Sequence, residues 1–322
     1  MRGRCESAFT RQDLVVRFSQ EVRRLLTQLP PGRVTTFGAL AAALGDARAA
    51  VPVFRLLGDD RPPGWHRVVR ADGSLAFREV APRLQLEGVG VREGAVQDFP
   101  RVLFHEFHSD RPLEVLRREQ RRLARRVVLA DRFGELTSVA GFDVSYGKSW
   151  AHGAAVLLDW ETLGVQEEVG LTTAVDFPYI STYLAYREFD PVVRCYAQFE
   201  DPPTLLMVDG NGTLHPERFG LACYVGLKLD RPTIGVAKSL LLGRLDRETL
   251  APGESTPVRV DGEAVGYALR TGSGKPIYVS PGHRISGPTA LRYVRRLCRT
   301  RIPEPLRLAD RAARRRRRDQ ES

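Results

Sequence analysis

The chain has 322 residues, and its content of 43% hydrophobic and 27% charged residues excludes a disordered chain and allows two globular domains. The formal charge of +10 favours a polyanionic partner, with nucleic acid as the first candidate. No apolar run has the length of a membrane span or of a signal-peptide core, and the four cysteines lack the spacing of a zinc site. We therefore expect a cytoplasmic protein with reduced thiols and no membrane partner.

The first hundred residues predict a small, mainly helical domain. Apolar residues recur at helical spacing over residues 13–29, a second helix fits 36–44 with a threonine cap, and a third fits 48–57. A proline-glycine turn at 62–64 then leads into a strand that includes 66–69.

Part of this region resembles a known DNA-binding family. The sequence PGRVTTFG at 31–38, a following helix, and the sequence HRVV at 66–69 resemble the DNA-binding domain of alkylguanine-DNA alkyltransferases. In that family the cysteine that accepts the alkyl group directly precedes the His-Arg-Val. This chain has Trp65 there, which resembles the alkyltransferase-like proteins that bind alkylated guanine without repairing it. An indole is no nucleophile, so alkyl transfer is not expected.

This resemblance implies a winged-helix-like DNA-binding domain over residues 1–100. Phe37 takes the place of the aromatic residue that helps to rotate a damaged nucleotide out of the duplex, and the lesion site includes Trp65, His66 and Arg67. The alternative is that Phe37 and Trp65 are ordinary core aromatics. Val51 stands where the family has its intercalating arginine.

The remainder of the chain predicts a second domain of the α/β class. A linker is expected at 101–112, followed by a basic helix over 113–133. The later elements are three antiparallel strands, a helix, a strand, a helix and a strand, at 138–146, 153–160, 163–171, 180–198, 205–209, 216–229 and 233–237. This is the order of the ribonuclease-H-like fold, a mixed sheet flanked by helices, in which the first and fourth strands lie side by side at the centre.

Two aspartates lie on those central strands. Asp143 falls within the first strand and Asp209 ends the fourth, so we expect their side chains to meet. A buried aspartate is costly unless it is paired or bound to a metal ion, which favours a divalent-cation site. The simpler alternative for Asp209 is that it caps the following turn.

Six motifs in order resemble endonuclease V over residues 113–313. They are AGFDVSY at 140–146, PYI at 178–180 with YRE at 186–188, VDGNG at 208–212 with HP at 215–216, IGVAKS at 234–239, SPGH at 280–283, and RIPEP at 301–305 with RLAD at 307–310. The resemblance implies that the metal-binding acids are Asp143, Glu188, Asp209 and Asp310. Such carboxylates hold one or two Mg²⁺ ions, for which Mn²⁺ can substitute, and the metal activates water and neutralises the leaving oxygen.

The same resemblance assigns further residues. Lys238 reaches the scissile phosphate or orients the water, and His215 helps to position water or phosphate. The wedge that fills the gap left by an extruded base is formed by Pro178, Tyr179 and Ile180, and the hypoxanthine pocket is lined by Leu184, Gly210 and Gly220.

Three further positions bear on this comparison. Ser181 replaces a proline that is usual in the wedge, and Tyr224 replaces a histidine that is common in the pocket. His283 either supports DNA contacts or makes a structural hydrogen bond.

The last residues, 314–322, contain a dense run of arginines. We expect a basic, disordered tail that either adds salt-sensitive affinity for DNA or is solvated without a role.

Together these observations predict a DNA repair endonuclease that nicks DNA one nucleotide 3′ of deoxyinosine and carries a non-repairing module for alkylated guanine. Two alternatives stay open. One is an inosine-specific endoribonuclease, because the sequence does not separate DNA from RNA as the partner. The other is a non-catalytic lesion-binding protein that recruits excision repair, although four converging acids with Lys238 argue for catalysis. The oligomeric state is also open.

Overall fold

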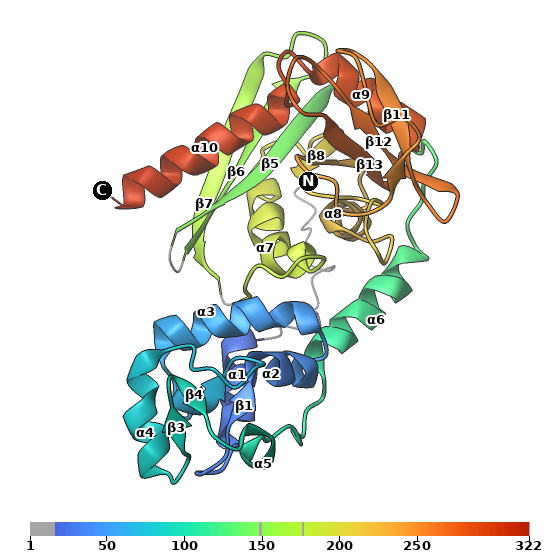
Figure 1. Cartoon of the computed structure of the whole chain (residues 1–322). Helices are drawn as coiled ribbons and strands as arrows, with labels where there is room; N and C mark the ends of the chain where they lie inside the picture. Colours follow the sequence, from blue (N-terminus) through green and yellow to red (C-terminus); the bar gives the residue numbers. More distant parts are fainter. Residues whose placement is uncertain (1–16, 148–149, 176, 322) are drawn as a thin grey trace. The chain divides into compact units, whose positions relative to one another are not determined.

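The computed structural model describes residues 17–147, 150–175 and 177–321 (Figure 1). The chain divides into two compact units, an N-terminal unit that ends at Leu116 and also takes in a short segment around Pro178, and a C-terminal unit that holds the rest. The division lies within helix α6 (Pro112–Ala124), a few residues beyond the linker expected at 101–112. None of the helices in the described part of the chain combines the length and apolarity that a bilayer crossing requires.

The N-terminal unit is mainly helical. Its helices are α1 (Phe18–Thr27), α2 (Phe37–Leu44), α3 (Ala50–Asp60), α4 (Ala81–Leu86) and α5 (Phe99–Val102). Two short parallel strands, β1 (Thr35–Thr36) and β2 (Val68–Val69), and a hairpin of β3 (Val91–Arg92) and β4 (Ala95–Val96) complete it. The helix predicted over 13–29 is therefore present as α1 from Phe18, and residues 13–16 lie outside the described part of the chain.

Local sequence explains where α2 begins and ends. The Thr36 side chain accepts a hydrogen bond from the Ala39 amide at 3.0 Å, and Gly45 ends the helix in the left-handed conformation with φ of 99°. Both features belong to the helix predicted at 36–44, and they satisfy backbone groups that helix ends leave without partners. The predicted linker is partly structured, because Val34 pairs through its backbone with Val102 and Phe104.

The C-terminal unit is built on a nine-stranded mixed sheet with the order β10-β11-β12-β13-β9-β8-β5-β6-β7. The strands are β5 (Ser138–Tyr146), β6 (Trp150–Asp159), β7 (Val165–Ala174), β8 (Leu205–Asp209), β9 (Thr233–Ala237), β10 (Arg244–Leu245), β11 (Ser255–Val260), β12 (Glu263–Leu269) and β13 (Ile277–His283). Strands β5 and β8 run parallel, with Val139 opposite Leu205 and Phe142 opposite Val208. This confirms that the first and fourth strands of the domain are central neighbours.

Helices cover both faces of this sheet. One face packs against α7 (Leu184–Tyr196) and α8 (Leu221–Leu229), and the other against α9 (Gly287–Leu297) and α10 (Glu304–Glu321) (Figure 1). Successive side chains of a strand point to opposite faces. Phe142 and Val208 join the core beneath α7 and α8, whereas Val139 and Met207 join the core beneath α9. Asp143 and Asp209 therefore share the face that α9 and α10 cover.

The prediction of a disordered tail at 314–322 is wrong over residues 314–321, because α10 continues to Glu321. Small residues explain the difference, since Ala309, Ala312 and Ala313 pack against β6 in a shared apolar cluster. The arginines that follow are good helix formers. The Arg317 guanidinium also donates to the Tyr146 carbonyl of β5 at 3.3 Å, which fastens the end of the helix to the sheet.

Gly141 fixes how closely α10 approaches β5. A Cβ atom at this position would lie 2.2 Å from the backbone carbon of Pro305, inside the first turn of α10. The β5 strand must therefore have glycine here for the helix to bring Asp310 to the same region as Asp143.

We expect Gly141→Ala to displace α10 and to lower the free energy of unfolding by about 1–3 kcal/mol, the usual cost of overpacking. Urea unfolding of the full chain measures this, with Gly134→Ala as the matched control because no atom lies within 4 Å of a Cβ there. Equal midpoints for the two variants would contradict the close approach.

Candidate active site

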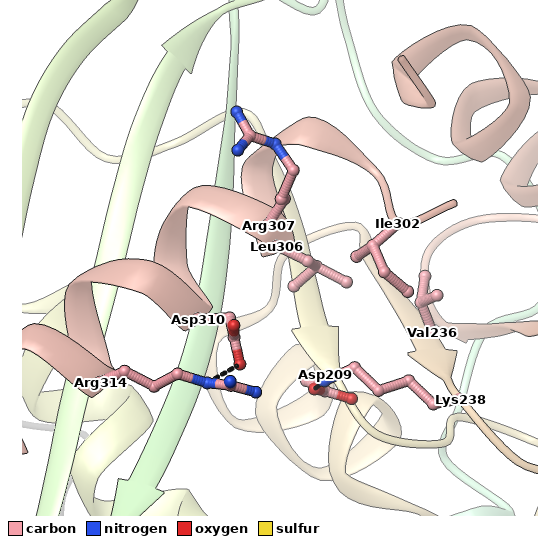
Figure 2. Close-up of a pocket in the computed structure, with 8 residues that line it drawn as sticks. All are labelled: Asp209, Val236, Lys238, Ile302, Leu306, Arg307, Asp310 and Arg314. Atoms are coloured by element: carbon pink, nitrogen blue, oxygen red, sulfur yellow. Dashed lines mark hydrogen bonds and ion pairs between the residues drawn. The ribbon is translucent and has the colours of Figure 1, made fainter. Parts of the chain in front are cut away.

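A pocket lies where β8 and β9 end, against α10 (Figure 2). Asp209 is the last residue of β8, Lys238 follows β9 directly, and Asp310 comes from the second turn of α10. The residues that line the pocket are Asp209, Val236, Lys238, Ile302, Leu306, Arg307, Asp310 and Arg314. Three elements that are distant in sequence thus place two acids and one lysine around a single opening.

Lys238 and Asp209 form the closest ion pair of this pocket. The Nζ of Lys238 donates to an Asp209 oxygen at 2.5 Å. Burial lowers the pKa of the Lys238 ammonium, but the negative charges around it, Asp209 first, outweigh this and raise the pKa overall. Lys238 therefore stays protonated and acts as a cation, not as a base.

Asp143 carries the electrostatic cost of the site. Burial raises the pKa of its carboxyl well above the ordinary range, and the charges of Asp209 and Asp310 raise it further, while Lys238 acts in the opposite direction. Like charges in a desolvated place disfavour ionisation of each carboxyl group. Lys238 and the Arg314 guanidinium, which pairs with Asp310, both bring positive charge to this group of acids, yet the pKa of Asp143 remains raised, so a further cation would be favourable here.

Glu188 approaches from α7 and is buried. Burial and then the charge of Asp143 raise its pKa, and the Tyr146 hydroxyl donates to it at 3.0 Å. The Arg187 guanidinium lies over the Tyr146 ring, 3.9 Å from its centroid. Tyr146 and Arg187 thus hold Glu188 in place. Nothing in the sequence analysis gave either a role, although Tyr146 shares the alternation of Phe142 and so faces α7.

The charges of the four predicted metal-binding acids influence one another, but their side chains are not arranged as a set of metal ligands. Within the described ranges, no three Asp, Glu, His or Cys side chains stand in an arrangement that could hold a metal ion. Each of three acids instead has a partner in the protein: Asp209 has Lys238, Glu188 has Tyr146, and Asp310 accepts from Arg314 at 3.0 Å. The donors, all hard carboxylate oxygens, nonetheless suit Mg²⁺ or Mn²⁺.

His215 is not among the residues that line the pocket, and its predicted role in positioning water or phosphate stays a prediction. The imidazole is buried, its Nδ1 accepts from the Glu217 amide at 3.1 Å, and its Nε2 therefore donates to the Thr182 carbonyl at 2.8 Å. Both ring nitrogens thus hold loop backbone together. His283 is likewise structural, because its Nδ1 accepts from the Val128 amide at 3.2 Å.

The predicted wedge residues differ in exposure. Tyr179 is 60% exposed, as a stacking ring should be, whereas Ile180 is 1% exposed and anchors the loop from inside. Pro178 is half-buried. Of the wedge, only Tyr179 presents a large exposed ring.

The predicted base-pocket residues also divide into two kinds. A Cβ at Gly210 would lie 3.4 Å from Leu184, so these two residues line the same space. A Cβ at Gly220 would meet the Asn211 carbonyl oxygen at 2.2 Å, so the fold itself requires glycine there. Tyr224 is a core residue that packs edge-on against Phe189.

In the N-terminal unit, the predicted lesion-site aromatics belong to one buried row. The Trp65 ring meets Phe77 edge-on, with 5.2 Å between the ring centroids. Phe77 stacks on Phe54 with a centroid distance of 5.4 Å, and Phe54 meets Phe37 edge-on at 5.3 Å. Trp65 and Phe37 are themselves buried. Phe54, on α3, is 40% exposed, so the row reaches the surface there.

His66 and Arg67 are engaged within the same unit. The Arg67 guanidinium donates to both oxygens of Glu87, at 2.8 and 2.7 Å, and to the Leu29 carbonyl at 2.7 Å. The Nε2 of His66 lies 2.9 Å from Glu87. The hydrogen bond from Arg67 is the largest influence on Glu87, and despite burial it helps to lower the pKa of that carboxyl to about 2. Both side chains thus have partners within the unit, and their lesion-binding role stays a prediction.

Two protein families match this chain, one in each unit. The family profile of endonuclease V matches residues 121–311, and that of the 6-O-methylguanine DNA methyltransferase DNA-binding domain matches residues 17–89. The chain belongs to the endonuclease V family. It is a DNA repair endonuclease with an alkyltransferase-like DNA-binding module, as the motifs predicted.

Both single-domain and two-domain relatives are found. A bifunctional methyltransferase/endonuclease of Picrophilus torridus is 35% identical over 296 residues, which cover 88% of this chain and 92% of the relative. An endonuclease V of Gloeobacter violaceus is 43% identical over 197 residues, 59% of this chain and 80% of the relative. The Picrophilus protein spans both modules of this chain.

Solved endonuclease V structures share the fold of the C-terminal unit. That of Streptomyces avermitilis is 36% identical, with a TM-score of 0.61, and covers 65% of this chain and 94% of its own. That of Ciona intestinalis, in complex with DNA that contains an inosine followed by a ribo-adenosine, is 28% identical, with a TM-score of 0.59, and covers 65% and 99%. These structures confirm the predicted α/β fold with flanking helices.

We expect His215→Ala to impair this endonuclease V through stability and not through chemistry. The substitution leaves the Glu217 amide and the Thr182 carbonyl without their partner, which costs about 2–4 kcal/mol of unfolding free energy. At a temperature where the variant stays folded, kcat should remain within about threefold of the parent. A loss of kcat of a hundredfold or more in the folded variant would restore the catalytic role.

A second expectation concerns the alkyltransferase-like module. Because the pKa of Glu87 is lowered from 4.5 to about 2, its ion pairs stabilise the folded state fully above pH 4.5, and this contribution is lost as the pH falls toward 2. Glu87→Gln should therefore reduce protection of module amides from hydrogen exchange at pH 7 by up to about 3 kcal/mol, and by progressively less in acid.

The matched control is Glu79→Gln, because the Glu79–Arg61 ion pair is half-exposed on both sides and should contribute about 0–1 kcal/mol. Hydrogen exchange followed by mass spectrometry on peptides of residues 17–89 reports both variants. Equal effects would show that burial of the Glu87 cluster has no energetic consequence.

Proposed function

We propose that this endonuclease hydrolyses the phosphodiester one nucleotide 3′ of deoxyinosine in DNA, with Mg²⁺ or Mn²⁺ as cofactor. The observation that carries the proposal is the Asp209–Lys238 pair in a pocket that Asp310 also lines, with Asp143 close enough for their charges to interact. The relative from Ciona intestinalis was crystallised with inosine-containing DNA, which supports the same lesion here.

The cation would be held by carboxylates from the set Asp143, Glu188, Asp209 and Asp310. When bound, a divalent ion supplies an activated water and neutralises the charge that builds on the phosphate. The acids of this chain suit such an ion, since burial and then the charges of neighbouring acids raise the pKa of Asp143 and Glu188. Tyr146 fixes the orientation of the Glu188 carboxyl through its hydroxyl.

Lys238 supplies the protein's own positive charge. Its ammonium is held protonated by the acids around it, so it can bind a non-bridging phosphate oxygen and stabilise negative charge in the transition state. Hydrophobic side chains on the far wall, Val236, Ile302 and Leu306, limit water around this contact. A lower local dielectric strengthens each of these electrostatic interactions.

A second candidate substrate has one observation in its favour. The DNA bound to the Ciona intestinalis relative carries a ribo-adenosine directly after the inosine. That relative therefore accepts a ribonucleotide on the 3′ side of the inosine. We propose cleavage beside a ribonucleotide as a second candidate activity of this chain.

We further propose that the N-terminal module binds alkylated guanine without transferring the alkyl group. Trp65 in the acceptor position supports this, because an indole cannot act as the nucleophile. A duplex with one O6-methylguanine, compared with its undamaged equivalent in chelator, tests the module by binding alone. Equal affinities would remove alkylguanine from the function of the module and leave general DNA binding.

We expect Asp209→Asn to lower cleavage of a duplex with one deoxyinosine by about a thousandfold or more, because one carboxylate ligand and the partner of Lys238 are both lost. Unfolding free energy should be unchanged or higher, since a repulsive charge is removed. Asp261→Asn is the matched control, because that residue is exposed in a hairpin turn at φ of 51°, where asparagine is also tolerated.

The measurement uses oligonucleotides of one sequence with a single inosine in DNA, in RNA, and in DNA with one ribonucleotide on its 3′ side, each with Mg²⁺ and with EDTA. Cleavage of the DNA substrate that needs the metal and Asp209 supports the proposal. A parent enzyme that cuts only RNA favours the endoribonuclease, and one that binds without cutting any substrate favours the lesion-binding alternative.

A further inference from the structure

The ordered C-terminal helix carries a row of arginines along its outer side. Helix α10 turns by about 100° per residue, which places Arg307, Arg311, Arg314 and Arg318 within about 60° of one another. We call these four residues the arginine stripe. Its length along the helix is about 16 Å, over which one strand of a duplex carries about five phosphates.

The other three arginines of the helix contact strands of the sheet. Arg315 forms an ion pair with Glu168 of β7, and Arg317 donates to the Tyr146 carbonyl. A Cβ at Gly170 of β7 would collide with the Arg316 side chain, so that side chain lies flat on the strand. These three residues fasten the helix, whereas the stripe belongs to its outer side.

The stripe begins at the proposed active site. Arg307 and Arg314 both line the pocket with Asp209 and Lys238. Figure 2 shows the Arg314 guanidinium reaching past Asp310 toward Asp209, while Arg307 points away from the opening. The Arg314 side chain is 61% exposed, so it is accessible to a strand that enters the pocket.

A stripe of this kind is unfavourable for an isolated helix. Arg311 and Arg314 are separated by three residues and Arg314 and Arg318 by four, and like charges at these separations destabilise a helix by about 0.2–0.5 kcal/mol per pair. The Asp310–Arg314 and Glu304–Arg307 ion pairs offset part of this repulsion within the chain. A polyanion bound along the outer side would reduce it further.

We propose that the arginine stripe is a track for the sugar-phosphate backbone of the nucleic acid strand that occupies the pocket. This rests on the proposed function in taking a nucleic acid as the ligand, and adds where the strand runs beyond the cleavage site. Arginine suits the role because its planar guanidinium binds a phosphate through two hydrogen bonds. The stripe reads no base, so it binds without sequence preference.

The test compares two triple variants of the full chain that lose the same charge. The stripe variant is Arg311→Gln, Arg314→Gln and Arg318→Gln. The control variant is Arg244→Gln, Arg247→Gln and Arg295→Gln, three exposed arginines on β10, the loop after it, and α9. Each variant lowers the formal charge from +10 by three, to +7. Glutamine is a good helix former, so α10 should persist.

The readout is fluorescence anisotropy of a labelled, undamaged duplex in EDTA at several salt concentrations. Because neither inosine nor metal is present, this result stands apart from the cleavage assay, and failure of the proposed nuclease function would show only in that assay. Each lost phosphate contact should reduce the slope of log affinity against log salt by about 0.9.

We expect the stripe variant to bind at least about tenfold more weakly at 100 mM salt, with a slope smaller by about 2–3, and the control variant to change by less than about threefold. A third variant with lysine at positions 311, 314 and 318 should recover most of the slope, since it keeps the charge. Equal losses in the stripe and control variants, or a lysine variant as weak as the glutamine variant, would overturn the proposal.

Discussion

Burial and mutual repulsion of carboxylates are the constraint on which this site depends. Burial first, and then the charges of neighbouring acids, raise the pKa of Asp143 and of Glu188, and within the pocket Lys238 is the closest cation to Asp209. Such a cluster lowers the stability of the fold, so packing elsewhere in the domain must hold the acids together. Here the parallel pairing of β5 with β8 brings two acids together, and the packing of α10 adds the third.

The need to bring these acids together also explains why α10 packs so closely against β5 and β6. Gly141 removes the side chain that would hold the first turn of the helix away from β5, and the alanines at 309, 312 and 313 let the next turns settle on β6. Close packing of small residues thus fixes where Asp310 and Arg314 stand. The helix is at once part of the core, a wall of the pocket and the carrier of the arginine stripe.

The sequence predicted the parts of this structure that are set by pattern and by short-range rules. The alternation of β5, the buried run of β8 and the caps of α2 are local signals, and the order of the elements, which is that of the ribonuclease-H-like fold, predicted the pairing of the two strands. It did not predict that residues 314–321 are helical. A run of arginines by itself indicates a solvated segment, and the packing of the preceding alanines on β6 is not evident from the sequence. The intramolecular contacts of His215, His66 and Arg67 could not be predicted for a related reason, since hydrogen bonds to backbone carbonyls and amides, or to a glutamate about twenty residues away, depend on tertiary packing.

The two ion-pair clusters of the chain show how similar chemistry leads to different outcomes. In the N-terminal unit, one carboxylate, Glu87, accepts hydrogen bonds from the guanidinium of Arg67 and lies beside the imidazole of His66, and these contacts lower its pKa to about 2. In the C-terminal unit burial and the charges of Asp209 and Asp310 raise the pKa of Asp143, although Lys238 and Arg314 supply positive charge to the same pocket. A carboxylate with close cationic partners thus forms a compact ion-pair cluster. Carboxylates whose ionisation is disfavoured would instead favour a further cation, which is the physical reason for proposing the second cluster as the catalytic one.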